Sequence, residues 1–209
     1  MYNAKAHQEH DLASLHRQML QTRLAILITH GDRGLLASHV PILLDPDEGP
    51  NGTAYAHLAR ANPQWQELGN GNETLLVFPG PDAYVSPGFY PSKAQDPRTV
   101  PTWNYLSVHA YGQAEIIRDG GRLLEIVSCL TDRHETGRND PWQVADAPAD
   151  YIEGMLRAIV GVRLPIERLQ GARKLSQNRT AADIEGVRTG LAASVDPLDN
   201  QLSAQMRPL

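Results

Sequence analysis

The alternation of apolar and polar positions predicts short strands over the first 117 residues. Apolar runs at 24–30 and 35–44 flank the turn GDRG and are typical of a β-hairpin or meander. Further strands are expected at 53–59, 73–80, 82–87 and 103–119, with a corner at Pro79-Gly80-Pro81 interrupting the chain. One more strand is expected later, at 162–176, where Pro165 favours an edge or a bulge.

Helices are expected before the first strand, at one place between the strands, and in the C-terminal half. Leu12, Leu15, Met19 and Leu20 repeat at the spacing of one helix face. A short helix is expected to start at Asn62, whose side chain suits a helix cap. The longer helices expected in the C-terminal half cover 122–135, 148–161 (ended by Gly161) and 180–194 (capped by Thr180), followed by a short helix and tail at 196–209.

Strands gathered early and helices gathered late favour an α+β fold, an antiparallel barrel flanked by helices, over alternating βαβ units. No glycine-rich strand-to-helix turn of the dinucleotide or P-loop type is present. We expect one domain over 1–190, with 191–209 as a C-terminal helix or tail.

Composition narrows the function classes. The net charge of −5 argues against a strong sequence-independent grip on DNA, which needs clustered Lys and Arg. Cys129 is the single cysteine, which excludes a disulfide framework within the chain. No apolar run approaches the roughly 18 residues that span a bilayer. The first thirty residues lack a signal-peptide pattern, so we expect a cytoplasmic protein with no membrane partner.

The usual catalytic and metal motifs are missing. Eight histidines show no HExxH pattern, and no GxSxG is present. His57 and His109 lie in expected strands, where hydrogen-bonded structural histidines are favoured over a metal site. We therefore predict no metal and assign no catalytic acid or base, although His109 and Tyr105 are the most plausible proton donors.

Three segments carry candidate binding chemistry. In YAHLARANPQW, a strand leads into a helix start beside His57 and Arg60, which favours an anion such as phosphate. In VPTWNY, Trp103 and Tyr105 point to one strand face and Asn104 to the other. That strand either reads a flat heteroaromatic ring or packs aromatic residues in a core. The polar segment KLSQNR is either a solvated loop or a loop that closes over a site.

Taken in order, five segments resemble the PaiB-type family of FMN-binding negative transcriptional regulators. They are MYNAKAHQEHD, HLARANPQW, FPGPDAYVSPGFY, VPTWNYLSVHAYG and KLSQNR. The resemblance covers residue 1 to about 190 and implies the split β-barrel of flavin reductase-like and pyridoxamine-phosphate-oxidase-like proteins. It further implies a homodimer that binds FMN at the subunit interface. Where the family reads GPHAYISPSWY, this chain carries Asp82 for His and Gly88-Phe89 for Ser-Trp, and an acid at position 82 disfavours a phosphate beside it.

The resemblance also implies a set of cofactor contacts. The phosphate is expected at His57, Ala59, Arg60 and Asn62. The isoalloxazine ring is expected near Thr29, Ala37 and Ser38, with Trp103 and Asn104 beside it. Residues of the second subunit are expected to reach in from KLSQNR, namely Lys174, Ser176, Gln177 and Arg179.

Two roles fit such a protein. The family name implies a repressor, and basic residues are dense between 157 and 188, so DNA is a possible partner of the dimer. The alternative is a flavin-dependent oxidoreductase of the same barrel superfamily, in which FMN carries the redox chemistry.

Overall fold

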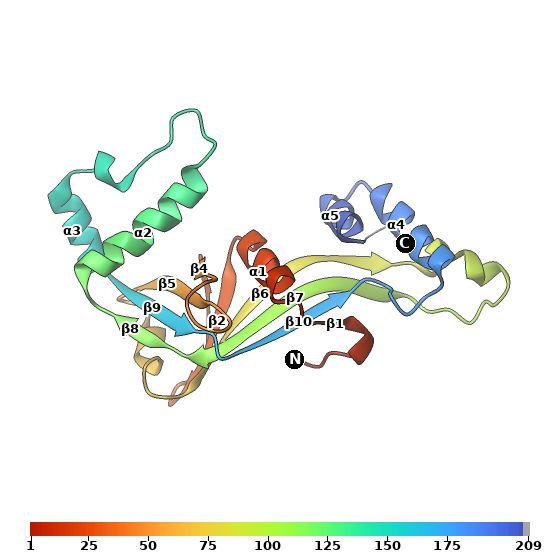
Figure 1. The fold of residues 1–209 in the computed structure, drawn as a ribbon, viewed down its shortest axis with the longest axis horizontal. Coiled ribbons are helices and arrows are strands. Elements are labelled where there is room, and N and C mark those ends of the chain that lie inside the picture. The colour runs from red at the N-terminus through yellow and green to blue at the C-terminus, as the bar shows by residue number, and fades with distance from the viewer. Residues whose placement is uncertain (207–209) are drawn as a thin grey trace. The chain divides into compact units, whose positions relative to one another are not determined.

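A computed structural model describes residues 1–206 and divides the chain into two compact units. Unit 1 comprises Met1–Gln18, Pro79–Val108 and the residues from Gln170 onward. Unit 2 comprises Met19–Phe78 and His109–Leu169. Four elements contribute residues to both units: α1 (Leu12–Gln21), β6 (Glu73–Val85), β7 (Thr102–Gln113) and β10 (Arg168–Lys174) (Figure 1).

Unit 2 contains a four-stranded antiparallel sheet covered by α2 (Gly120–Glu135). The strand order is β4 (Leu43–Asp45), β5 (Thr53–Ala59), β9 (Ile159–Pro165) and β8 (Glu115–Ile117). Tyr55 of β5 packs against Ile126 and Leu130 on the apolar face of α2, and α3 (Ala149–Arg157) contacts both α2 and β9 (Figure 1). This packing fixes the position of β5, which carries His57.

A second part of unit 2 is the hairpin of β2 (Ala25–Gly31) and β3 (Gly34–Val40), with β6 paired to the other edge of β2. Gly34 has a φ of 80° in the tight turn, a conformation that glycine adopts without strain. Gln64 of the short 3-10 helix η2 (Pro63–Glu67) is buried, and its Nε2 donates to the carbonyls of Leu27 and Leu36. That amide fastens η2 to both strands of the hairpin.

Unit 1 is built on four strands in the order β1 (Gln8–Glu9), β10, β7 and β6, with two helices over one face. The helices are α4 (Ala181–Ala192), capped by the Thr180 hydroxyl as predicted, and α5 (Pro197–Gln205), which packs against it (Figure 1). The core between strands and helices includes Ala83, Val85, Leu106, Val187, Leu191 and Leu202. Short 3-10 helices complete the description: η1 (Lys5–His7), η3 (Pro87–Phe89) and η4 (Pro91–Ala94) in this unit, and η5 (Val144–Asp146) in unit 2.

Several predicted element boundaries are wrong. The strand expected to break at Pro79-Gly80-Pro81 runs on as β6, and a Cβ on Gly80 would lie 2.8 Å from the Leu106 Cβ, so close strand packing requires this glycine. Gly161 does not end a helix: α3 stops at Arg157, and Gly161 lies within β9, where a Cβ would meet Leu123 and Ile117. The strands expected at 103–119 and 162–176 are each divided into two. Within residues 1–206, no helix is both long and apolar enough to cross a bilayer.

Candidate functional site

In unit 2, the start of η2 meets the hydroxyl of Ser38 on β3. The Asn62 side chain caps η2, because its Oδ1 accepts a hydrogen bond from the Gln64 backbone N–H at 3.0 Å. Its Nδ2 donates to the Ser38 Oγ at 2.9 Å. Ser38 stands opposite Leu27 in the hairpin, and Ala37 stands opposite Ile28. The predicted Ala37, Ser38 and Asn62 are therefore neighbours in this unit.

Thr29 supplies a buried hydroxyl to the same hairpin. The residue is 2% exposed, and its Oγ1 has no hydrogen-bond partner within residues 1–206. Thr29 pairs with Leu36, two positions from Ser38 on the neighbouring strand. Buried polar atoms are nearly always paired, so an unpaired hydroxyl indicates a place where a ligand or an ordered water binds.

His57 presents a second unpaired polar atom. It lies on β5 opposite Gly161, and β5 contacts β3 of the hairpin. The imidazole Nδ1 is buried without a partner among the described residues. Burial lowers the pKa of His57, since the charged form loses hydration. The ring is therefore neutral near pH 7 and can donate one N–H to an anion.

Arg60 follows Ala59, the last residue of β5, and its guanidinium is partly engaged. Nε donates to the Arg157 carbonyl at 2.8 Å, and Nη2 donates to the Ile159 carbonyl at 3.0 Å. The predicted helix start is also occupied, because Asn62 already caps a helix of only five residues. An anion in this region would therefore contact side-chain donors and not the helix start.

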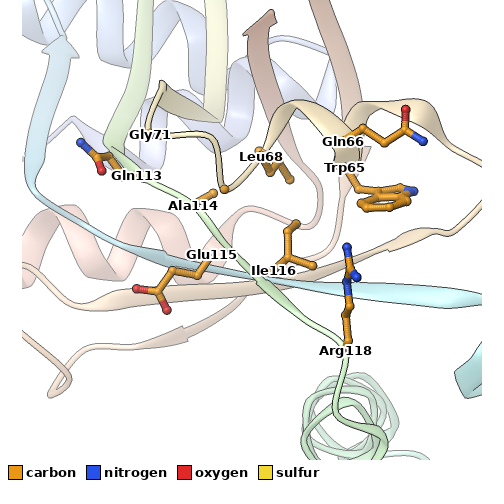
Figure 2. Close-up of a pocket in the computed structure, with 10 residues that line it drawn as sticks. Trp65, Gln66, Leu68, Gly71, Gln113, Ala114, Glu115, Ile116 and Arg118 are labelled. Carbon is orange, nitrogen blue, oxygen red and sulfur yellow. The ribbon is translucent and has the colours of Figure 1, made fainter.

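Sequence reasoning missed a cleft of unit 2. It has a volume of about 690 Å³ and lies between η2, the loop at 68–71 and β8. Figure 2 shows the Arg118 side chain extending toward the Trp65 indole, and the guanidinium carbon lies 5.4 Å from the ring centroid. Trp65 belongs to the HLARANPQW segment, so this tryptophan is the sequence feature that could have pointed to the cleft. Among the described lining residues Arg118 is the one cation, and the Glu115 carboxylate on the same wall is paired with Arg163, so the cleft is poorly suited to a phosphate.

In unit 1, Asn104 and the KLSQNR segment come together around a small cavity. Asn104 is fully buried, and its Nδ2 donates to the Ser176 Oγ at 2.9 Å. The Lys174 Nζ donates to the Thr102 Oγ1 at 2.7 Å. The cavity has a volume of about 170 Å³, and Asn104, Lys174, Ser176 and Arg179 all line it. KLSQNR is therefore not a simple solvated loop.

Gln177 and Trp103 lie outside this cavity wall. The Gln177 Oε1 accepts from the Leu175 N–H at 2.7 Å, so this side chain closes the turn after β10. Trp103 is 54% exposed and meets Tyr84 edge-on, with ring centroids 6.0 Å apart. The interpretation of VPTWNY as a core strand with buried aromatic residues is wrong at Trp103, whereas the predicted alternation of faces is confirmed by the buried Asn104.

Both histidines expected in strands, His57 and His109, are partly buried in the structure. Within residues 1–206, no three His, Cys, Asp or Glu side chains are placed to hold a metal ion. The His109 Nδ1 lies 3.3 Å from the Tyr111 hydroxyl, and burial lowers the pKa of His109.

A family model described as "Putative FMN-binding domain" matches residues 1–168. The chain belongs to this family. A protein of Bacillus subtilis named protease synthase and sporulation protein PAI 2 is 31% identical over 171 residues, which cover 82% of this chain and 79% of that protein. An uncharacterized protein of Emericella nidulans is 34% identical over 225 residues, covering 91% and 90% of the two chains. The expected PaiB-type family and the expected cofactor, FMN, are confirmed by these matches.

Solved structures confirm the fold predicted for this chain. The FAD and heme binding protein from Mycobacterium smegmatis superposes with a TM-score of 0.61 at 17% identity, covering 85% of this chain and 78% of that one. The flavocytochrome Anf3 from Azotobacter vinelandii gives a TM-score of 0.59 at 18% identity, covering 83% and 69%. The predicted α+β split β-barrel is therefore the fold of this chain.

Proposed function

We propose that the donor set of unit 2 holds FMN. In this proposal His57, Arg60 and Asn62 contact the phosphate with the backbone of Ala59, and the isoalloxazine ring lies along the hairpin. The hairpin contacts are those of Thr29, Ala37 and Ser38. FMN supplies the redox chemistry when bound, and the chain binds and orients it.

The unpaired Thr29 Oγ1 and His57 Nδ1 carry this proposal. The His57 imidazole and the Arg60 guanidinium are neutral and cationic donors for the phosphate, and the Thr29 and Ser38 hydroxyls are donors for the isoalloxazine ring. A phosphate accepts hydrogen bonds from such donors, and those from a guanidinium are charge-assisted. The residues therefore fit a phosphate-bearing cofactor.

Titration of the flavin fluorescence with purified protein tests the proposal. We expect saturable binding of FMN and weaker binding of riboflavin, because only FMN carries the phosphate. A folded protein with no saturable FMN binding contradicts the proposal. Equal affinity for the two flavins contradicts the phosphate assignment alone.

A homodimer belongs to the same proposal. The Trp103 and Tyr84 rings expose an aromatic pair on the strand face opposite the buried Asn104 and Val85. Exposed aromatic residues of this kind are enriched at protein interfaces. We also propose that Trp103 and Asn104 lie beside the isoalloxazine ring. Residues of a second subunit complete the FMN site in this proposal, namely Lys174, Ser176, Gln177 and Arg179.

We infer that any regulatory role acts through the flavin state or a partner protein and does not depend on a broad grip on DNA. The relative is named protease synthase and sporulation protein PAI 2, and the regulatory role is proposed from the PaiB-type family, with a cytoplasmic location that fits such a role. The basic residues between 157 and 188 are mostly neutralised, however. Within residues 1–206, five arginines of this region form ion pairs: Arg157 with Glu153, Arg163 with Glu48 and Glu115, Arg168 with Glu73, Arg173 with Glu9, and Arg188 with Glu185. A gel shift at physiological salt tests direct binding, and specific retardation would contradict the indirect route.

A flavin-dependent oxidoreductase is the second candidate, and the FMN cofactor itself favours it. Its test is oxidation of a pyridine nucleotide that depends on bound FMN. His109 is half-buried with a lowered pKa and is the first residue to vary in that case. Loss of turnover in His109→Asn with unchanged FMN affinity would support a proton-donor role for the imidazole.

A further inference from the structure

The cavity of unit 1 has an internal wall made of paired polar side chains. The Asn104 carboxamide is fully buried and exchanges hydrogen bonds with the Ser176 hydroxyl at 2.9 and 3.3 Å. Ser176 has a φ of 64°, and it is the one non-glycine residue within the described part of the chain with a positive φ. Strained backbone held in place by its surroundings is concentrated at functional sites.

Tyr90 adds a polar atom that the fold leaves unused. The residue is 3% exposed and lines the cavity, and its hydroxyl has no partner within residues 1–206. The Arg179 guanidinium lies over the Tyr90 ring, 4.8 Å from its centroid, at the edge of the same cavity. A buried, unpaired phenol in a cavity wall is a hydrogen-bond donor for a ligand.

The charge around the cavity has one sign. Lys174 is half-buried and uses one of its three N–H donors on Thr102. Arg179 and His7 also line the cavity, and no described lining residue carries a carboxylate. The Asp183 carboxylate, which interacts with Arg179, is satisfied by the backbone and side chain of Ser92. Two cations therefore face the cavity without a carboxylate on its wall.

The size of the cavity limits what it can hold. A volume of about 170 Å³ is below the range of roughly 300–1,000 Å³ typical of cofactor and drug-sized ligand sites. It suits a ligand of a few non-hydrogen atoms. We propose that this cavity binds a small oxyanion, a carboxylate or an inorganic phosphate, which accepts hydrogen bonds from the Tyr90 hydroxyl and the Lys174 ammonium. Tyr90 is not among the predicted FMN contacts, whereas Lys174 is one of them, so an FMN titration of the Tyr90 variant distinguishes this oxyanion site from a part of the flavin site.

Isothermal titration calorimetry of the FMN-loaded protein tests the proposal, with acetate and phosphate as separate probes in a chloride buffer of constant ionic strength. We expect saturable heat with one or both probes. Tyr90→Phe removes only the hydroxyl, and Lys174→Met removes only the charge. Each variant should bind the probe about tenfold or more weakly, the usual loss for a hydrogen bond to a charged group. Tyr84→Phe and Lys93→Met, both exposed in the same unit, should bind it as the wild type does.

Each outcome decides the matter. Binding of acetate alone, phosphate alone or both, weakened by Tyr90→Phe and Lys174→Met, supports the site and names its ligand class. Absence of saturable heat at millimolar probe concentrations overturns it. Equal affinities for the wild type and Tyr90→Phe overturn it as well. A separate FMN titration should be unchanged in Tyr90→Phe, because Tyr90 is not among the predicted FMN contacts, and a loss of FMN affinity in this variant would make the cavity a part of the flavin site instead. Lys174→Met is not used in this comparison, because Lys174 is itself a predicted FMN contact of the second subunit.

Discussion

The Asn104 carboxamide and the Ser176 hydroxyl form a closed hydrogen-bonded pair across 72 sequence positions, with Nδ2 and Oγ 2.9 Å apart. Asn104 comes from β7, and Ser176 follows β10. Asn104 is fully buried and Ser176 is 4% exposed, so water does not reach either side chain. Loss of this hydrogen bond would therefore leave a buried polar group without a partner, which costs free energy. The pair thus joins strand and loop at the wall of the unit 1 cavity.

Asn104→Ala is expected to destabilise the protein by about 1–3 kcal/mol, because it leaves the Ser176 hydroxyl buried without its partner. Ser176→Gly removes the same hydrogen bond but places glycine at a φ of 64°, where it is unstrained. We therefore expect a smaller loss for Ser176→Gly. Urea denaturation of both variants measures the difference, and a larger loss in Ser176→Gly would contradict this account.

Thr29→Val should separate stability from binding. The Thr29 hydroxyl has no partner in the described chain, so its removal is expected to leave the unfolding free energy of the FMN-free protein unchanged or to raise it by up to about 1 kcal/mol. If the hydroxyl contacts FMN, the same variant should bind FMN about tenfold more weakly. Denaturation and fluorescence titration supply the two readouts.

Thr53→Val is the matched control in unit 2. Thr53 is 1% exposed, but its Oγ1 donates to the Glu48 carbonyl at 3.0 Å. This variant should lose about 1–2 kcal/mol of stability and keep its FMN affinity, the reverse of Thr29→Val. Identical behaviour of the two variants would show that Thr29 is an ordinary buried threonine.

Local patterns predicted most elements, because caps and periodicity act over a few residues. The Thr180 cap of α4 and the hairpin at 24–44 are such cases. The errors arose where contacts with residues distant in the sequence determine the backbone conformation. Gly80 is required by Leu106 across the sheet, and Gly161 by Leu123 of α2, so neither glycine marks the turn or helix end that its neighbours indicate.

The candidate site shows the same division. The local sequence was enough to pick out His57 and Asn62 as candidate hydrogen-bond donors. It could not show which of their polar atoms are left unpaired by the fold. That Asn62 binds Ser38, and that His57 keeps an unpaired Nδ1, depends on how β3 and β5 are packed. Likewise, the sequence between 157 and 188 does not reveal which acidic residues pair with its arginines. Three of these partners, Glu9, Glu48 and Glu73, lie more than 90 positions away in the sequence.

Arg60→Ala should weaken FMN binding by about tenfold or more and leave riboflavin binding nearly unchanged, because only the phosphate pairs with the guanidinium. Arg118→Ala is the matched control, since its guanidinium lies over Trp65 in the cleft beside β8 in the same unit. Fluorescence titration of both flavins with both variants provides the measurement. An equal loss for FMN and riboflavin in Arg60→Ala would assign Arg60 to the structure around Ile159 and not to the phosphate.

Trp103→Arg is expected to disrupt the proposed homodimer. The variant places a charge within the exposed aromatic pair with Tyr84, and a charge that association desolvates is costly. Light scattering coupled to gel filtration should report about half the wild-type mass. Trp142→Arg, at a tryptophan of similar exposure, should keep the wild-type mass. A wild-type chain that is already monomeric would refute the homodimer before any variant is made.

Stability in acid should depend on Glu48. Its carboxylate accepts hydrogen bonds from the Tyr55 hydroxyl at 2.5 Å and from Arg163, and these contacts lower the pKa of Glu48 below its ordinary value of 4.5. A lowered pKa in the folded state contributes stability above pH 4.5, and this contribution is lost as the pH falls through the folded-state pKa. Because the Glu48 and Arg163 side chains are 31% and 29% exposed, solvent screening limits the effect to on the order of 1 kcal/mol.

Glu48→Gln should therefore be less stable than the wild type near neutral pH, and the difference should shrink as the pH is lowered below 4.5. Urea denaturation across this range measures it. Glu125→Gln, which breaks an exposed pair with Arg122 on α2, should differ little from the wild type at any pH. A stability gap for Glu48→Gln that stays constant into acid would mean that the amide disrupts packing around Tyr55, and that the charge of Glu48 contributes nothing.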